Sequence, residues 1–305
     1  MLSPIVLFVY NRLEHTKKTV EALKNNFLAK ESDLFIFSDG PKDELGNLKV
    51  DNLRKYLKTV SGFKNVNIIE QNENIGLAKS IISGVTEIVN KYGKIIVLED
   101  DLVTSPNFLT YMNEGLKMYE SEDRVISIHG YSYPLKEILP DTFFLKFTSS
   151  WGWATWKRGW DLFESDGKKL LTELEHRKLI KEFNFNNSYH FSETLLRQSL
   201  GQKDSWAIRW YASAFINNKL SLYPKKSLIQ NIGFDGSGIH SGKSNVYDIK
   251  ELDDYISVKI IPIIEDKAVR RMIEKYFNSI KASLVKRIMW KLSAFRNKFL
   301  SLKNR

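Results

Sequence analysis

The stretch KIIVLEDDLVTSPNF, residues 94–108, contains the most strongly apolar strand pattern of the chain and ends that strand on negative charge. Residues 95–98 are all apolar, and three of them are β-branched. Such a run is typical of a strand buried on both faces of a parallel sheet. Three adjacent carboxylates follow it directly: Glu99, Asp100 and Asp101. A buried strand that ends on three negative charges indicates a partner that balances them.

Further strand patterns alternate with helical ones over the first 130 residues. The strands occur in PIVLFVY (4–10), DLFIFSDG (33–40), NVNIIEQ (65–71) and VISIHGY (125–131). Helical spacing occurs in residues 44–60, in 76–93, which Gly93 closes, and from Pro106 to about Tyr119, with Ser105 as the cap. Apolar strands that alternate with helices predict an α/β fold with a mostly parallel, doubly wound sheet flanked by helices.

Length and composition set the outer limits. The chain has 305 residues, 43% of them hydrophobic, so it can build a sizeable core. It has no cysteine, which excludes disulfides and thiolate metal sites and suits a reducing compartment such as the cytoplasm. The first apolar run is too short for a signal peptide or a membrane span, and no later run approaches eighteen residues.

After about residue 135 the alternation of strand and helix patterns fades. We expect one compact unit, 1–260, made of a nucleotide-binding part (1–135) and an acceptor or catalytic part (136–260), followed by a tail (261–305).

The tail carries most of the positive charge. The formal net charge is +10, and residues 275–305 hold nine Lys or Arg with no Asp or Glu. The rest of the chain is nearly neutral, so the charge does not favour nucleic acid. Apolar residues recur there in steps of three and four: Ile273, Phe277, Ile280, Leu284, Ile288, Leu292, Phe295, Phe299 and Leu302. This pattern predicts a basic amphipathic helix that binds an anionic membrane surface, on the inner face of the cytoplasmic membrane, or packs on the protein's own body or on a second copy in a homodimer.

Polar side chains follow several strands at the edge where open parallel sheets bind ligands. Arg12 follows the first strand, Asp39 the second, and the acidic trio the fourth. Clustered carboxylates repel one another unless a cation lies among them, and hard oxygen ligands favour Mg²⁺ or Mn²⁺. Such a metal can bridge a diphosphate leaving group. The alternative is a solvated loop that is acidic by chance.

An ordered set of motifs carries a family resemblance. The set is VYNR, SDG, NIGLAKSI, VLEDDL, SSWGWATW, DSWAIRW and NIGFDGSGIH, and it spans residues 5 to about 240. With these motifs the chain resembles glycosyltransferases of the GT-A (Rossmann-like) fold. More narrowly, it is similar to the N-acetylglucosaminyltransferase I-like group and its bacterial relatives in surface-polysaccharide synthesis. The resemblance implies a UDP-sugar donor and Mn²⁺ or Mg²⁺ as cofactor.

The resemblance also implies roles for the residues at the sheet edge. Asp39 would hold the uracil edge, and Arg12 would lie near the nucleotide and its phosphates. Asp101 would bind the metal directly, while Asp100 and Glu99 would support the ribose and the inner face of the sugar.

Three further residues are candidates for the donor site: Lys79, Trp151 and Trp153. Lys79 in GLAKSI approaches the phosphates or is an exposed helical lysine. Trp151 and Trp153 are expected in the sugar pocket, because pyranose rings stack on aromatic faces. Trp156 and Trp160 have helical spacing and are expected in the core.

Inversion in one displacement needs a base for the acceptor hydroxyl. Asp204 occupies the place of the family's catalytic aspartate, although Asp204-Ser205 also reads as a helix cap. Glu193 and Asp235 are the alternatives for the base. His240 is a metal ligand, a phosphate contact or an ordinary loop histidine.

The sequence therefore predicts a metal-dependent, inverting transferase that moves a sugar from a UDP-sugar to a glycan or lipid-linked acceptor. Two other readings remain. A sugar-nucleotide nucleotidyltransferase usually opens with a glycine-rich phosphate loop, which VYNRLEHT lacks. A non-catalytic glycan-binding or membrane-scaffolding protein would leave the acidic trio and Asp204 without a purpose.

Overall fold

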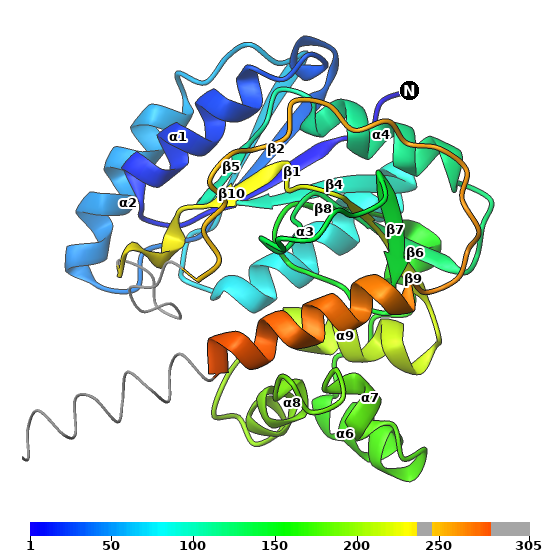
Figure 1. Cartoon of the computed structure of the whole chain (residues 1–305). Coiled ribbons are helices and arrows are strands. Elements are labelled where there is room, and N and C mark those ends of the chain that lie inside the picture. The colour runs from blue at the N-terminus through cyan, green and yellow to red at the C-terminus, as the bar shows by residue number, and fades with distance from the viewer. Residues whose placement is uncertain (237–245, 282–305) are drawn as a thin grey trace, which may run out of the picture.

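The computed structural model describes residues 1–236 and 246–281 (Figure 1). Within them a sheet of eight strands forms the centre of the molecule, in the order β3-β2-β1-β4-β8-β6-β9-β7. In that order the strands are β3 Asn65–Glu70, β2 Asp33–Ser38, β1 Ile5–Val9, β4 Lys94–Glu99, β8 Trp153–Trp156, β6 Val125–His129, β9 Leu220–Pro224 and β7 Thr142–Leu145. A separate antiparallel ribbon pairs β5 (Leu102–Thr104) with β10 (Ile229–Asn231).

The pairing confirms a mixed, mostly parallel sheet. The neighbours β3, β2, β1 and β4 are parallel, as are β6 and β9. Strand β8 lies antiparallel between β4 and β6, and β7 is antiparallel to β9. The carboxyl ends of β1, β2 and β4 therefore meet at one edge. With helices on both faces, this is the α/β, GT-A-like class expected from the sequence.

Side chains of β1 point alternately to two helical layers. Ile5, Leu7 and Val9 pack with α1 (Leu13–Lys24), α2 (Glu44–Leu57) and α4 (Phe108–Met118). Val6 and Phe8 face the other layer, with α3 (Leu77–Tyr92), α5 (Lys157–Trp160) and α9 (Trp206–Ile216). Apolar residues on both faces of the strand explain its unbroken hydrophobic pattern.

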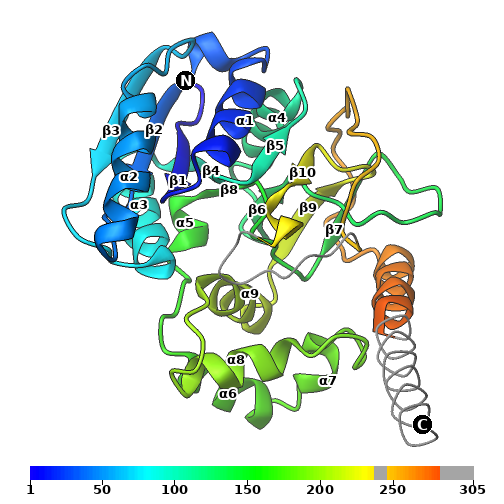
Figure 2. The same cartoon turned by 90° about the vertical axis from the view of Figure 1, so that its left-hand side faces the viewer.

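A smaller helical group lies below α9, as Figure 2 shows. It consists of α6 (Gly167–His176), α7 (Ile180–Phe183) and α8 (Phe191–Ser199). These helices share a third apolar cluster with α9 and β7. Short 3-10 turns occur at η1 (Ala29–Glu31) and η2 (Gly233–Asp235).

The structure tests two predicted helix boundaries, the end of α3 and the start of α4. Gly93 follows α3 with φ 76°, so the prediction that it closes the helix is confirmed. The expected start of the next helix is wrong. Helix α4 begins at Phe108, because residues 106 and 107 form a turn in which the Phe108 N–H bonds the Ser105 carbonyl (3.1 Å).

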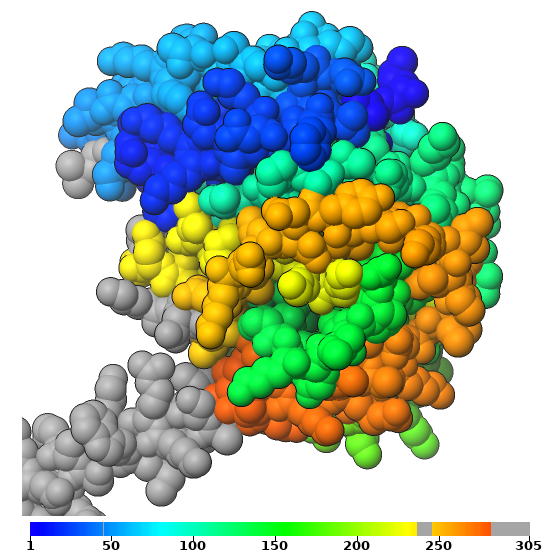
Figure 3. Space-filling view, turned by 45° about the horizontal axis from the view of Figure 1, so that its top comes forward, coloured from blue at the N-terminus to red at the C-terminus, as the bar shows by residue number. Residues whose placement is uncertain are grey.

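The described part of the predicted tail packs against the body. A strip of chain first crosses the surface (Figure 3), and residues 267–281 then form a helix. Its apolar side is buried: Val269, Ile273 and Phe277 are only 1–2% exposed and belong to the third cluster. This part of the tail therefore agrees with the alternative prediction that the helix packs on the protein's own body. Residues 282–305 lie outside the described part, and within that part no helix could cross a membrane.

Candidate active site

The polar residues predicted at the sheet edge meet there. The Arg12 guanidinium bonds the Asp100 carboxylate, and its Nη2 lies 2.9 Å from Asp101 Oδ2. Arg12 comes from the turn after β1, whereas the carboxylates follow β4, which is the parallel neighbour of β1. The sheet register thus places one cation among the acids.

Burial disfavours the ionised forms of two of the three acids, Glu99 and Asp100. It raises the pKa of Glu99 well above its usual range, and the charges of Asp101 and Asp100 raise it further, against the effect of Arg12. Burial also raises the pKa of Asp100 to about 6, although the charge of Arg12 acts in the opposite direction. One guanidinium does not balance three carboxylates, so a further cation would be stabilised here.

These residues fit a metal that is shared with a substrate. Among the described residues there is no group of three or more His, Asp or Glu side chains that could hold an ion by itself. Mg²⁺-type sites, however, often use one or two carboxylates together with substrate phosphates and water. Asp101 suits such a site, because its carboxylate lines the cavity described below. His240 lies outside the described residues.

The ribbon of β5 and β10 brings a second loop over the acids. The Ile232 N–H bonds the Asp101 carbonyl oxygen (2.9 Å), which places the turn after β10 on the acidic trio. At Gly233 a Cβ atom would lie 2.1 Å from Asp101 Oδ2, so a side chain there would displace the Asp101 carboxylate. Asp235, one alternative base, lies in this turn and pairs with His15 at 3.2 Å.

Asp39 fastens a loop to the end of β2. Its Oδ1 accepts bonds from the N–H groups of Gly40 and Ile75, and its Oδ2 accepts from Gly76 N–H and Asn74 Nδ2, at 2.9–3.1 Å. Asp39 is buried, and its hydrogen bonds hold the residues just before α3 in place. The contact with uracil stays a prediction.

A cavity of about 410 Å³ lies beside the acids and brings distant candidates together. Its wall includes Glu99 at the end of β4, Asp101 just after it, Trp151 before β8, and Asp204 before α9. Together these residues span more than 100 positions of the sequence, and the crossing of the strands joins them at one hollow. Glu99 and Asp101 therefore open onto a space that is also lined by an aromatic ring and by the exposed carboxylate of Asp204.

The expectation for Trp153 is wrong. Its side chain is fully buried and packs on Trp206, Trp160 and Trp210, with ring centroids 5.4–5.8 Å apart. Central strand β8 directs it into the core and away from the cavity. Trp156 and Trp160 are also buried, as expected.

Asp204 is exposed and oriented by an arginine. Its Oδ1 lies 2.9 Å from Arg209 Nη2, and its side chain is 68% exposed. The capping position of α9 belongs to Ser205, whose Oγ accepts from the Ile208 N–H (3.5 Å). The carboxylate is therefore not needed as a cap. Lys79 is exposed on the first turn of α3 and shares a second hollow, of about 650 Å³, with Asp204.

The comparisons with known proteins address the family directly. The model of glycosyl transferase family 2 matches residues 5–174, more than half of the chain. The chain belongs to glycosyl transferase family 2. No curated protein matches it.

Two solved structures show a remote likeness to this family 2 chain. The mannosyltransferase PcManGT from Pyrobaculum calidifontis, solved with GDP-Man and Mn²⁺, is 9% identical, with 70% of this chain and 74% of that chain covered and a TM-score of 0.39. TarS 1–349 from S. aureus is 11% identical, with 75% and 60% covered and a TM-score of 0.42. Neither adds to the assignment.

Sequence analysis missed much of the cavity wall of this family 2 transferase. The additional lining residues include seven aromatic ones outside the quoted motifs: Tyr133, Phe147, Tyr189, Phe191, Tyr211, Tyr247 and Phe277. They come from several elements and share no motif, so no local pattern marks them. Phe277 belongs to the helix 267–281, which had been expected to be an appended tail.

Proposed function

We propose that this family 2 glycosyltransferase moves a sugar from a UDP-sugar to a glycan or lipid-linked acceptor, with inversion and with a divalent metal. The observation that carries the proposal is the cavity lined by Glu99, Asp101, Trp151 and Asp204. It offers carboxylates for a metal-bound diphosphate, a ring for a sugar and a carboxylate for the acceptor. Within the family, we place the chain near the N-acetylglucosaminyltransferase I-like group and in bacterial surface-polysaccharide synthesis.

On the donor side, Asp101 would hold Mn²⁺ or Mg²⁺ together with the diphosphate. When bound, the metal supplies positive charge to the departing diphosphate. Arg12 keeps the carboxylates in position and adds a fixed positive charge near the phosphates. Asp39, through the loop that it fastens, shapes the end of the sheet at which the uracil would lie. Lys79 can reach toward the phosphates from the first turn of α3.

On the acceptor side, Asp204 would take the proton of the attacking hydroxyl. Its exposure leaves it accessible from the cavity, and Arg209 fixes its direction. In a single displacement the acceptor hydroxyl attacks the anomeric carbon as the diphosphate leaves, which inverts that centre and requires one base and no nucleophile from the enzyme. Trp151 would contact the transferred sugar.

The far end of the tail suits an anionic membrane. Residues 282–305 carry seven Lys or Arg and no Asp or Glu, and each such residue near an anionic bilayer contributes about 1 kcal/mol. This would keep the enzyme on the inner face of the cytoplasmic membrane, beside a lipid-linked acceptor. Flotation with anionic liposomes tests it: the full chain should float, and a chain shortened after residue 281 should not. Equal flotation would reject membrane attachment and favour contact with a second copy.

The donor site is tested by calorimetry with UDP and Mn²⁺. Asp101→Ala should abolish the Mn²⁺-dependent binding. Asp51→Ala, which removes an exposed carboxylate on α2, should leave it unchanged. Wild-type affinity in Asp101→Ala would exclude Asp101 as the metal ligand. A screen of UDP-sugars for UDP release then identifies the donor.

A further inference from the structure

A third, smaller hollow, of about 260 Å³, adjoins the candidate active site. It lies between the start of α8 and the helix 267–281, and it shares Tyr189, Thr194 and Phe277 with the cavity that holds the acids. A molecule that extends from Asp204 along this wall therefore passes directly from one hollow into the other.

The wall of this hollow offers an aromatic surface. Tyr189 is 36% exposed, and its ring is supported by Phe191 and Phe277, whose centroids lie 4.4 and 5.0 Å away. The supported ring keeps its orientation while part of its surface stays open. Pyranose rings stack on such surfaces through their C–H groups.

Buried hydroxyl groups without partners line the same two spaces. The Oγ atom of Ser188, in the small hollow, and the Oγ1 atom of Thr148, in the larger cavity, have no hydrogen-bond partner among the described residues. Both residues are at most 5% exposed. Because buried polar groups are nearly always paired, these two hydroxyls keep unused hydrogen-bonding capacity in the walls of the two spaces.

The backbone before Ser188 is held in an unfavourable conformation. Phe185, Asn186 and Asn187 have φ values of 47°, 52° and 64°. The helix 267–281 holds this turn, because Asn186 Nδ2 donates to Glu274 Oε1 (2.8 Å) and Lys281 Nζ donates to the Asn187 carbonyl (3.3 Å). Left-handed backbone at residues other than glycine persists only where the surroundings impose it, and it concentrates at ligand sites.

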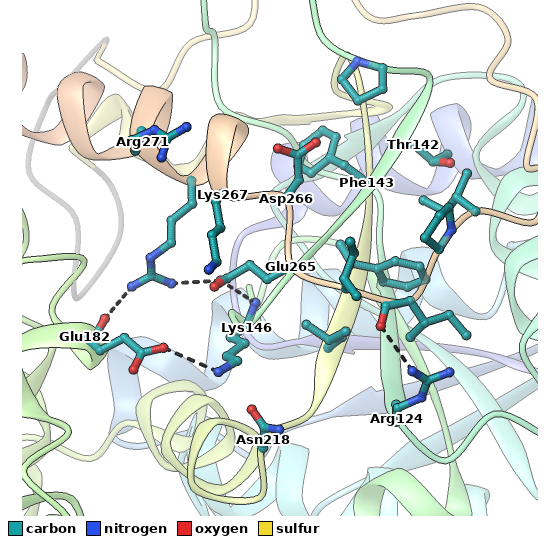
Figure 4. A pocket seen from close by; sticks show the side chains of 18 of the residues that line it. Arg124, Thr142, Phe143, Lys146, Glu182, Asn218, Glu265, Asp266, Lys267 and Arg271 are labelled. Carbon is teal, nitrogen blue, oxygen red and sulfur yellow. Dashed lines mark hydrogen bonds and ion pairs between the residues drawn. The ribbon is translucent and has the colours of Figure 1, made fainter.

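Buried charges fix that helix to the body. Arg270 pairs with Glu265 (2.9 Å) and with Glu274 (3.3 Å), donates to the Glu182 carbonyl, and lies 4.2 Å from the Phe185 ring. Figure 4 shows Glu265 and Glu182 of this network in a larger hollow, where Glu182 also pairs with Lys146 (3.4 Å). The helix that forms one wall of the small hollow is therefore firmly placed.

We propose that the acceptor's sugar ring binds in the small hollow, stacked on Tyr189, with Ser188 bonded to one of its hydroxyls. The ligand class is a pyranoside, and the helix 267–281 is part of its binding site. The proposal rests on the proposed function, since it gives Asp204 its acceptor. It adds Tyr189 and Ser188 as residues that determine acceptor specificity.

Saturation-transfer NMR on the full chain tests this subsite. The probes are methyl β-D-glucopyranoside, methyl β-D-galactopyranoside, methyl α-D-mannopyranoside and the methyl glycoside of N-acetyl-β-D-glucosamine. We expect at least one to bind the wild type and to bind Tyr189→Ala roughly five- to tenfold more weakly, the factor that an aromatic contact supplies. Tyr189→Phe should keep most of the affinity. Tyr255→Ala, at an exposed tyrosine outside both hollows, should keep all of it.

UDP binding with Mn²⁺ is measured on the same samples. It should be equal in all variants, which shows that the fold and the donor site are intact. Unchanged pyranoside affinity in Tyr189→Ala, or no binding of any probe to the wild type, would overturn the subsite. Pyranoside binding through Tyr189 in a protein that does not bind UDP would support the subsite and reject the UDP-sugar donor.

Discussion

The variant Phe277→Ala tests whether the helix 267–281 packs on the protein itself or uses its apolar face to bind a membrane surface. The Phe277 side chain is 2% exposed, with aromatic neighbours that include Tyr133 (5.1 Å) and Phe185 (5.5 Å). Truncation of a buried phenylalanine to alanine costs about 3–5 kcal/mol, through lost burial and the cavity left behind. In a chain of this size each kcal/mol shifts Tm by roughly 2–4 °C. We therefore expect Tm to fall by roughly 6–20 °C.

The assay is thermal unfolding of the full chain without lipid, supported by urea denaturation. Ile264→Ala is the control, because Ile264 lies just before the same helix and is 68% exposed. It should change stability by no more than about 0.5 kcal/mol. If Phe277→Ala unfolds at the wild-type temperature and only loses affinity for anionic liposomes, the packing of this helix against the body is refuted.

Three further changes test the base, a buried histidine and the loop held by Asp39. Asp204→Asn should lower turnover roughly a hundredfold or more while UDP affinity stays near that of the wild type; near-normal turnover would point to Glu193 or Asp235. His129 is buried, which lowers its pKa to about 3, so below pH 6.5 the unfolded chain binds a proton that the folded chain does not. The free energy of unfolding should therefore decrease as the pH is lowered, by about 2 kcal/mol from this group at pH 5. Urea denaturation at pH 8 and pH 5 should show a smaller pH effect in His129→Gln, and an equal effect would contradict the argument. In Gly40→Ala the new Cβ would lie 2.3 Å from the Glu73 carbonyl carbon. This variant should lose about 1–3 kcal/mol of stability and bind UDP more weakly, whereas unaltered UDP affinity would separate this loop from the donor site.

Much of the sheet and its edge could be predicted from the sequence alone. Unbroken apolar runs such as Ile95 to Leu98 indicate strands covered on both faces, because only a two-sided layer buries every side chain. Parallel strands end at a common edge, so Arg12 and the acids after β4 were expected to meet, and they form an ion pair there. These inferences are local, or need only the parallel pairing of neighbouring strands.

The division between Trp151 and Trp153 was decided by tertiary structure. Two residues apart, they would share a face of a regular strand. Gly152 has φ 63° and precedes β8, so this alternation does not extend to Trp151. Strand β8 then inserts antiparallel between β4 and β6, which buries Trp153 and leaves Trp151 at the cavity. The sequence contains no signal for that insertion.

The other wall of the cavity likewise depends on the whole fold. The periodic pattern around Ile273 and Phe277 predicts an apolar helix face, but its period is the same whether the face meets lipid, a second copy or the body. Tyr189 and Phe277 lie 88 positions apart and meet because Arg270 and Glu274 fasten the helix beside the left-handed turn. The sequence by itself determined that this face would be buried. Which surface buries it was decided by contacts between distant segments, which become definite only when the complete chain has packed.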